Sequence, residues 1–153
     1  MAEDSATVRL GFLLNFARYV EWPVTGLKPG DPLRVCLAPG DAAMASQLGE
    51  LAMQSIQNRP IQVRQIARPT DAMGCNLLFL PAETPGSLSV WLGVAQKAGA
   101  LTVGDGPDMV EAGGIIGLVS EDGRYRFDVN LGVARRAELR FSSQLLKLAR
   151  TIR

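Results

Sequence analysis

The stretch Leu33-Arg34-Val35-Cys36-Leu37, with Pro39-Gly40-Asp41 one residue further on, decides how the rest of the chain is organised. Four of its first five residues are apolar, which predicts a buried β-strand. Pro39 and Gly40 favour a turn, and the side chain of Asp41 is suited to cap a helix that runs to about Met53. A strand, a turn and a helix in succession form the repeating unit of a parallel α/β sheet.

The same alternation continues along the chain. Five more strands are predicted, over residues 61–66, 76–80, 100–103, 115–119 and 124–129. Helices are predicted over residues 5–20, 87–96, 130–137 and 143–150, with a short one between Asp105 and Gly113. Asp122-Gly123 favours a hairpin between the last two strands. The expected fold is a three-layer α/β sandwich with a mostly parallel sheet of about six strands and an antiparallel hairpin near the C-terminus.

The first helix has a broad apolar face. Its apolar residues recur at helical spacing, so we expect the helix to pack across the domain through Phe12, Phe16 and Val20. Pro23 ends this helix, because the residue before a proline is pushed out of the α region. A loop rich in glycine and proline follows over residues 24–32.

The composition fits one globular domain, residues 1–153. Hydrophobic residues make up 47% of the chain, the net charge is +1 and no basic run exceeds Arg135-Arg136, so nucleic-acid binding is not expected. No apolar stretch approaches the roughly 18 residues of a membrane span, so direct membrane insertion is not expected either. The first residues lack the pattern of a signal peptide. Two interpretations follow: a cytosolic protein, or the mature form of an exported one.

The sequence contains no histidine, which excludes several kinds of active site. A Ser-His-Asp or Cys-His arrangement cannot form within the chain. Zinc sites lose their usual nitrogen ligand, and two cysteines are too few for a four-cysteine site. The glycines at 104–106 and 113–114 do not complete a dinucleotide fingerprint, and no acidic spacing matches a calcium loop. We therefore expect a protein that is not an enzyme and holds no metal or cofactor.

Cys36 and Cys75 are the two cysteines of the chain. Each lies in or just before a strand of the same predicted sheet, so their α-carbons can come within the ~4.4–6.8 Å that a disulfide needs. Two buried free thiols are the alternative, since a core tolerates cysteine well. The residues alone leave both states open.

Six segments in a fixed order resemble the YfiR-like family, small periplasmic proteins that restrain a membrane-bound diguanylate cyclase. The segments are LLNFARYVEWP at 13–23 and the stretches 75–80, 101–105, 113–116, 125–130 and 142–149. The resemblance runs from about residue 8 to the C-terminus. It implies a periplasmic protein, favours a Cys36–Cys75 disulfide and suits a homodimer.

Trp22 and its neighbours are the first candidates for contact with a partner. Glu21 and Trp22 follow the first helix, and tryptophan combines a large apolar area with one hydrogen-bond donor, which suits an interface anchor. The alternative is that Trp22 closes the end of the core while Glu21 is solvated. Arg59 matches the family position before the second strand, where it would form an ion pair inside the fold or contact a partner.

Alternate residues of the last long strand form a polar stripe, and they are Arg124, Arg126, Asp128 and Asn130. The stripe is either a recognition surface, with Arg140 nearby in sequence, or an ordinary solvated face. The resemblance favours recognition for Asp128. Asn130 is more typical of a cap for the next helix.

The function that the resemblance implies is a non-enzymatic periplasmic regulator. It would bind and inhibit the sensor domain of an inner-membrane diguanylate cyclase, lowering cyclic di-GMP signalling and biofilm formation, with redox sensitivity through Cys36 and Cys75. The alternative is a periplasmic small-ligand binding or sensor domain. Open α/β sheets bind ligands at the carboxyl ends of their strands, which here lie near Asp41, Pro81 and Asp105.

Overall fold

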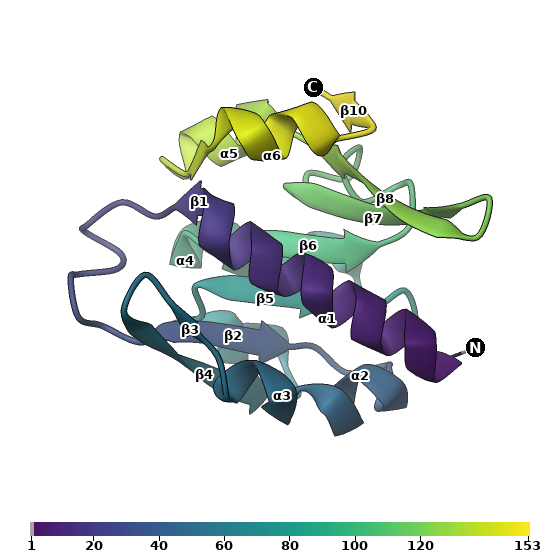
Figure 1. Cartoon of the computed structure of the whole chain (residues 1–153), viewed down its shortest axis with the longest axis horizontal. Coiled ribbons are helices and arrows are strands. Elements are labelled where there is room, and N and C mark those ends of the chain that lie inside the picture. Colours follow the sequence, from purple (N-terminus) through teal and green to yellow (C-terminus); the bar gives the residue numbers. More distant parts are fainter. Residues whose placement is uncertain (1) are drawn as a thin grey trace.

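The fold is built on one eight-stranded sheet. The computed structural model in Figure 1 describes residues 2–153, with side chains from Ser5 onward. The strands lie in the order β10-β8-β7-β6-β5-β2-β4-β3. The longer ones are β2 (Leu33–Leu37), β4 (Arg59–Gln65), β5 (Leu77–Leu80), β6 (Leu101–Asp105), β7 (Ile116–Glu121) and β8 (Arg124–Val129). All six predicted strands are confirmed.

Helices cover both faces of this sheet, which confirms the three-layer α/β sandwich. Helix α1 (Ala2–Tyr19) crosses the front face in Figure 1, and α2 (Ala42–Gln47) and α3 (Gly49–Ala52) share its core. Helix α4 (Leu88–Ala98) and the 3₁₀ turn η1 (Pro69–Ala72) lie on the far face. Helices α5 (Leu131–Arg136) and α6 (Ser143–Leu148) lie together near β8.

The sheet is parallel from β4 through β2, β5 and β6 to β7, and β8 runs antiparallel to β7. The hairpin turn is at Asp122 and Gly123, which have φ of 52° and 76°, as the Asp-Gly pair predicts. The chain leaves β2 first to one side, for β4, and then returns to the other side, for β5. The topological switch point therefore lies between β2 and β5.

Two apolar clusters fill the space on either side of the sheet. On the α1 side Phe16 is fully buried and meets Phe127 edge-on, with ring centroids 5.1 Å apart. The predicted anchors Phe12, Phe16 and Val20 all belong to this cluster, although Val20 already lies in the short strand β1 (Val20–Glu21).

The far-face cluster contains the cysteines. Cys36 and Cys75 form a disulfide, which confirms that prediction, and both residues are buried around Trp91. Cys36 lies in β2 and Cys75 lies just before β5, so the disulfide links two neighbouring strands.

The helix predicted between Asp105 and Gly113 is wrong: residues 107–113 form turns. The tight packing around Met109 explains the difference. Met109 is buried, and a Cβ at Gly104 or Gly114 would lie 1.7 and 2.3 Å from its side chain. The segment therefore wraps around one methionine instead of forming a helix, and Asp105 ends β6 with its side chain accepting a hydrogen bond from Arg9.

Three further details differ from the prediction. The helix expected from Asp41 to Met53 is divided into α2 and α3, although Asp41 does cap α2 by accepting from the N–H of Met44. The last helix ends at Leu148, two residues early, because the chain then forms the edge strand β10 (Thr151–Ile152) beside β8. The other edge strand, β3 (Ser55–Ile56), was not predicted either.

Candidate functional site

The residues predicted to contact a partner fall into two groups. Trp22, Glu21, Arg59 and Arg140 gather at the amino-terminal edge of the parallel strands, where α1 ends. Arg126 and Asp128 lie apart from them, in β8 beside the C-terminal strand.

Trp22 is half-buried at the end of α1. Its indole Nε1 donates to the carbonyl oxygen of Asn76 at 2.9 Å, directly before β5. The same oxygen accepts from the N–H of Leu101 at 2.8 Å, so Trp22 adds a second bond to a carbonyl already used by the sheet. The tryptophan thus fixes the end of α1 to the sheet edge and leaves part of its ring exposed.

Glu21 and Arg140 face each other across a small antiparallel ladder. Strand β1 pairs with β9 (Arg140–Phe141), with Glu21 opposite Arg140 and Val20 opposite Phe141. Beside this ladder lies an open cavity of about 600 Å³, which we call the Trp22 cleft. One wall is formed by residues 21–25, and the other by Arg135 and residues 138–140.

Arg59 lies on the other side of Trp22. Its Nη1 donates to the carbonyl oxygens of Lys28 and Asp31 at 2.7 and 2.8 Å, so it holds the loop before β2 in place, and it forms no ion pair with any residue from Ser5 onward. Arg59, Trp22 and Glu21 line a smaller cavity of about 190 Å³. Glu21 and Trp22 therefore form a wall shared by two cavities.

Asp128 is buried, which differs from its expected place on a polar stripe. Its carboxylate accepts from Nε and Nη2 of Arg150 at 2.9 and 2.8 Å, and Arg150 also bonds Glu121 at 2.9 Å. Although burial acts in the opposite direction, the hydrogen bonds from Arg150 and Thr151 hold the pKa of Asp128 below its usual range. Any contribution of Asp128 to a partner surface would pass through Arg150.

Arg126 is exposed and lies 3.8 Å from Glu121, so it joins the outer side of this network. Arg140 is not near it, because β9 pairs with β1 rather than lying beside β8. Asn130 caps α5 by accepting from the N–H of Val133 at 3.1 Å, as expected. The predicted stripe is thus divided between a buried ion pair, a helix cap and exposed arginines.

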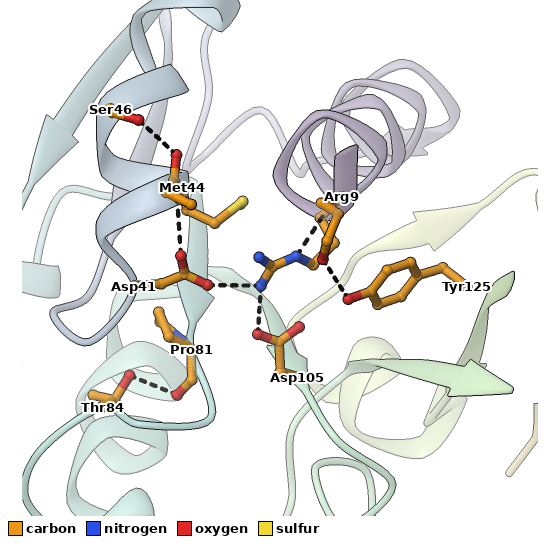
Figure 2. Close-up of polar contacts among 10 residues, drawn as sticks. Arg9, Asp41, Met44, Ser46, Pro81, Thr84, Asp105 and Tyr125 are labelled. Atoms are coloured by element: carbon orange, nitrogen blue, oxygen red, sulfur yellow. Dashed lines mark hydrogen bonds and ion pairs between the residues drawn. The ribbon is translucent and has the colours of Figure 1, made fainter. Parts of the chain in front are cut away.

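The carboxyl edge of the sheet, the expected place for a small ligand, is occupied by an arginine of the chain itself. Figure 2 shows Arg9 of α1 between two aspartates, with Nη1 2.8 Å from Asp41 Oδ2 and 2.8 Å from Asp105 Oδ2. Asp41 and Asp105 follow or end β2 and β6, so Arg9 ties α1 across this edge. Arg9 is only 6% exposed.

The loops at this edge also close on each other. Gly40 has φ of 119°, and a Cβ there would lie 2.7 Å from the carbonyl carbon of Glu83. Burial raises the pKa of Asp105, and the neighbouring Asp41 adds to this, outweighing Arg9. Asp105 Oδ1 is buried and accepts no hydrogen bond within the described residues. The geometry is that of a buried internal ion cluster and not of an open ligand crevice.

Two of the residues that shape these sites were not found from the sequence. Arg9 carries a detectable signal, because it lies on the same helical face as Leu13 and Phe16, and a charge on an apolar face must be paired. Arg150 carries none, since its partner Asp128 is brought to it by the unpredicted strand β10. Among the residues with described side chains, no three carboxylates or cysteines come together as a metal site would require.

Comparison with known proteins places this arrangement in a family. A profile of YfiR/HmsC-like proteins (DUF4154) matches residues 6–150, nearly the whole chain. The chain belongs to the YfiR/HmsC-like family. The match covers both walls of the Trp22 cleft, the Arg9 cluster and both cysteines of the YfiR/HmsC-like domain. Among curated proteins, none matches the sequence. No helix within residues 2–153 is long and apolar enough to cross a bilayer.

Two of the solved structures that share the fold match 85% of this chain. One is a conserved domain protein from Vibrio cholerae O1 biovar El Tor, with a TM-score of 0.58 and 14% identity over 85% of this chain and 57% of that one. The other is an ABC domain from Streptococcus pneumonia in complex with L-Trp, with a TM-score of 0.58 and 14% identity over 85% of this chain and 58% of that one. The chain thus spans less than two thirds of the length of either structure, and the likeness concerns the fold alone.

Proposed function

We propose that this YfiR/HmsC-like protein is a non-enzymatic periplasmic regulator that binds the periplasmic sensor domain of an inner-membrane diguanylate cyclase and holds the cyclase in a low-activity state. Family membership supports this proposal, and one structural observation identifies a candidate binding surface. Glu21 and Trp22, which were selected together, and Arg140, which was selected with the polar stripe, line the same cleft. Tryptophan and arginine are enriched among residues that dominate binding at protein interfaces.

The inhibition would work by population shift. A regulator suppresses an enzyme only to the extent that it binds the inactive conformation more tightly than the active one. Binding through the Trp22 cleft would favour the inactive sensor conformation and so lower cyclic di-GMP synthesis and biofilm formation. The disulfide is better suited to stabilising the fold than to switching it, because Cys36 and Cys75 are buried and attack on a disulfide requires access to a sulfur.

The test is a calorimetric titration in oxidising buffer with the periplasmic domain of the diguanylate cyclase encoded nearest this gene. We expect saturable binding with a Kd in the micromolar range or tighter. Val24→Asp places a charge on a cleft wall at a side chain that is 66% exposed, so it should weaken binding without unfolding the protein. Met53→Asp is the matched control, since Met53 is 81% exposed and lies outside the cleft.

The results of these titrations distinguish binding through the Trp22 cleft from binding elsewhere and from no binding. Weaker binding by Val24→Asp with unchanged binding by Met53→Asp supports the cleft, and equal loss in both variants contradicts it. A folded sensor domain that does not bind the wild-type protein argues against the regulator. Full-length cyclase in vesicles should also synthesise less cyclic di-GMP when the protein is added. A homodimer remains a prediction, and sedimentation of the free protein tests it.

The volume of the Trp22 cleft supports a second candidate, a periplasmic small-ligand binding or sensor domain. At about 600 Å³ the cleft lies within the ~300–1,000 Å³ range of small-molecule sites. The carboxyl edge of the sheet is a poorer candidate for a ligand site, because Arg9 already binds Asp41 and Asp105 there. Native mass spectrometry of protein purified from the periplasm tests this function, and a bound metabolite lost in Val24→Asp would support it.

A further inference from the structure

The charges of this protein are unevenly divided along the chain. Residues 131–153, which we call the C-terminal cap, contain six basic residues and one acidic residue. Residues 1–130 contain ten basic and fourteen acidic residues. A chain with a net charge of +1 thus consists of a strongly basic cap on an acidic body.

The cap is one continuous part of the molecule. It comprises α5, β9, α6 and β10, which lie together at the top of Figure 1, on the β10 edge of the sheet. Strands β4 and β3 form the opposite edge. Because the basic residues are collected at one end, their fields add instead of cancelling.

Two of the six basic side chains are already neutralised. Arg150 pairs with Asp128 and Glu121, and Arg153 lies 3.0 Å from Glu111. The other four are exposed, and their side chains form no ion pair or hydrogen bond with any residue whose side chain is described; they are Arg135, Arg136, Arg140 and Lys147. Glu138 is the single acidic residue of the cap, and Glu21 of the body faces Arg140 across the β1–β9 ladder.

Two of the three free arginines are part of a concave surface. Arg135 and Arg140 line the Trp22 cleft, opposite Trp22 and the exposed Val24. Glu21 and Glu138 line it as well, so the excess of positive charge belongs to the cap as a whole and not to the cleft alone. A flat lipid surface cannot enter such a cleft, whereas a projecting loop or helix end of a protein can. Guanidinium groups bind carboxylates with two parallel hydrogen bonds, which gives such a contact a defined geometry.

We propose that the C-terminal cap docks on an acidic surface of the partner protein, with a projecting carboxylate-bearing segment received between Trp22, Arg135 and Arg140. This inference rests on the proposed function and adds the chemistry of the partner surface. The partner is defined by its charge: Asp or Glu side chains around an apolar group that meets Trp22. The basic cap steers the partner to the cleft, and the arginines hold it there.

The experiment measures binding of the same cyclase sensor domain at about 50 mM and about 500 mM NaCl, since salt screens charge attraction over these concentrations. We expect wild-type Kd to weaken several-fold at high salt. The double variant Arg135→Glu/Arg140→Glu should weaken Kd at least about tenfold at low salt and lose most of the salt dependence. Arg64→Glu is the matched control, an exposed arginine in β4 near the opposite edge, and should stay within about twofold.

Thermal unfolding of each variant checks that it is folded at the temperature of the titration. Arg135→Gln/Arg140→Gln should lose less affinity than the double charge reversal. Wild-type binding that neither salt nor the double variant changes overturns the acidic-surface proposal while leaving the proposed function intact. Absence of wild-type binding to a folded sensor domain overturns both. Binding to phosphatidylglycerol vesicles but not to the sensor domain overturns the proposal in favour of a membrane surface.

Discussion

Asp128 and Arg150 form a two-point ion pair that ties the last long strand to the end of the chain. Nε of Arg150 is 2.9 Å from Asp128 Oδ1, and Nη2 is 2.8 Å from Oδ2. The carboxylate is buried while the guanidinium remains partly exposed. Strand β10 is two residues long, and the ion pair adds a side-chain link to the backbone hydrogen bonds that Arg150 and Arg153 donate to Phe127 and Val129.

Arg150→Met should destabilise the protein more than Asp128→Asn, because it leaves a buried carboxylate without its partner. The pH dependence follows from the lowered pKa of Asp128. A carboxyl group with a lowered pKa in the folded state contributes stability above its unfolded pKa of about 3.9, and loses it as pH falls through the folded value. Urea unfolding should therefore show the gap between wild type and Asp128→Asn closing below about pH 4. Arg153→Met, which removes a more exposed pair, should change little.

The stability of the protein should depend on which charge of the Arg9 cluster is removed, the cation Arg9 or the anion Asp105. Arg9→Met leaves two facing carboxylates and should cost about 3–5 kcal/mol of stability. Asp105→Asn should be close to neutral at pH 7, because the raised pKa of Asp105 shows that its charge is disfavoured there and Asp41 still binds Arg9. A carboxyl group whose pKa is raised by folding binds its proton more readily in the folded state, so the stability of the wild type should rise relative to that of Asp105→Asn as the pH falls from about 7 towards the unfolded pKa of about 3.9. Urea midpoints across this range test it, and a constant gap would contradict it.

Gly40 and Gly106 offer a matched pair for testing how closely the carboxyl-edge loops approach. Both have left-handed backbone angles, with φ of 119° and 109°. A Cβ at Gly40 would lie 2.7–2.8 Å from backbone atoms of Glu83 and Thr84, whereas a Cβ at Gly106 has open space around it. Gly40→Ala should therefore be about 1–3 kcal/mol less stable than Gly106→Ala. Thermal or urea unfolding of the two variants measures this, and equal losses would show that the loops can separate freely.

The long strands and the helix caps could be predicted because their signals are local. The apolar run before Pro39, the Asp-Gly pair at 122–123 and the capping residues Asp41 and Asn130 each determine the backbone within a few positions. The helix between Asp105 and Gly113 was predicted wrongly for a non-local reason. Met109 is buried against Gly104 and Gly114, and that packing outweighs local helix preference.

The candidate site was predictable in its members but not in its grouping. Trp22 and Arg140 could each be selected by residue type. They are brought together by a ladder of two residues per strand, which is too short to show the alternation of apolar and polar residues that predicts a strand. Asp128 was selected as a recognition residue, but the unpredicted strand β10 and Arg150 bury it. Contacts between short elements distant in sequence depend on the assembled fold, and so they carry little local signal.

The Cys36–Cys75 bond should act as a structural crosslink. It closes a separation of 39 residues, for which the chain-entropy model gives about 4 kcal/mol of stabilisation. Cys36→Ala/Cys75→Ala should lose about this amount in urea unfolding. Because both cysteines are buried, dithiothreitol should reduce the native protein far more slowly than the unfolded protein. Rapid thiol labelling of native protein after mild reduction would instead support a redox switch.

A comparison with Trp91 can distinguish the structural role of Trp22 from its role in binding. Each indole donates one hydrogen bond to a backbone carbonyl, Trp22 to Asn76 at 2.9 Å and Trp91 to Pro85 at 3.0 Å. Trp22 lines both cavities, whereas Trp91 is buried in the far-face cluster. Trp22→Phe and Trp91→Phe should each lose about 1 kcal/mol from the missing hydrogen bond. Trp91→Phe should cost more in total, because the smaller ring leaves a cavity in the buried cluster.

Binding then distinguishes the two tryptophans. At a temperature well below both unfolding transitions, Trp22→Phe should weaken the affinity for the cyclase sensor domain several-fold, because the smaller ring removes contact area from the cleft wall. Trp91→Phe should leave the affinity unchanged, since Trp91 is 2% exposed on the opposite side of the sheet. Calorimetric Kd values for wild type and the two variants give the answer directly. Equal affinities in all three proteins, each folded at the temperature of the measurement, would mean that Trp22 serves the fold alone.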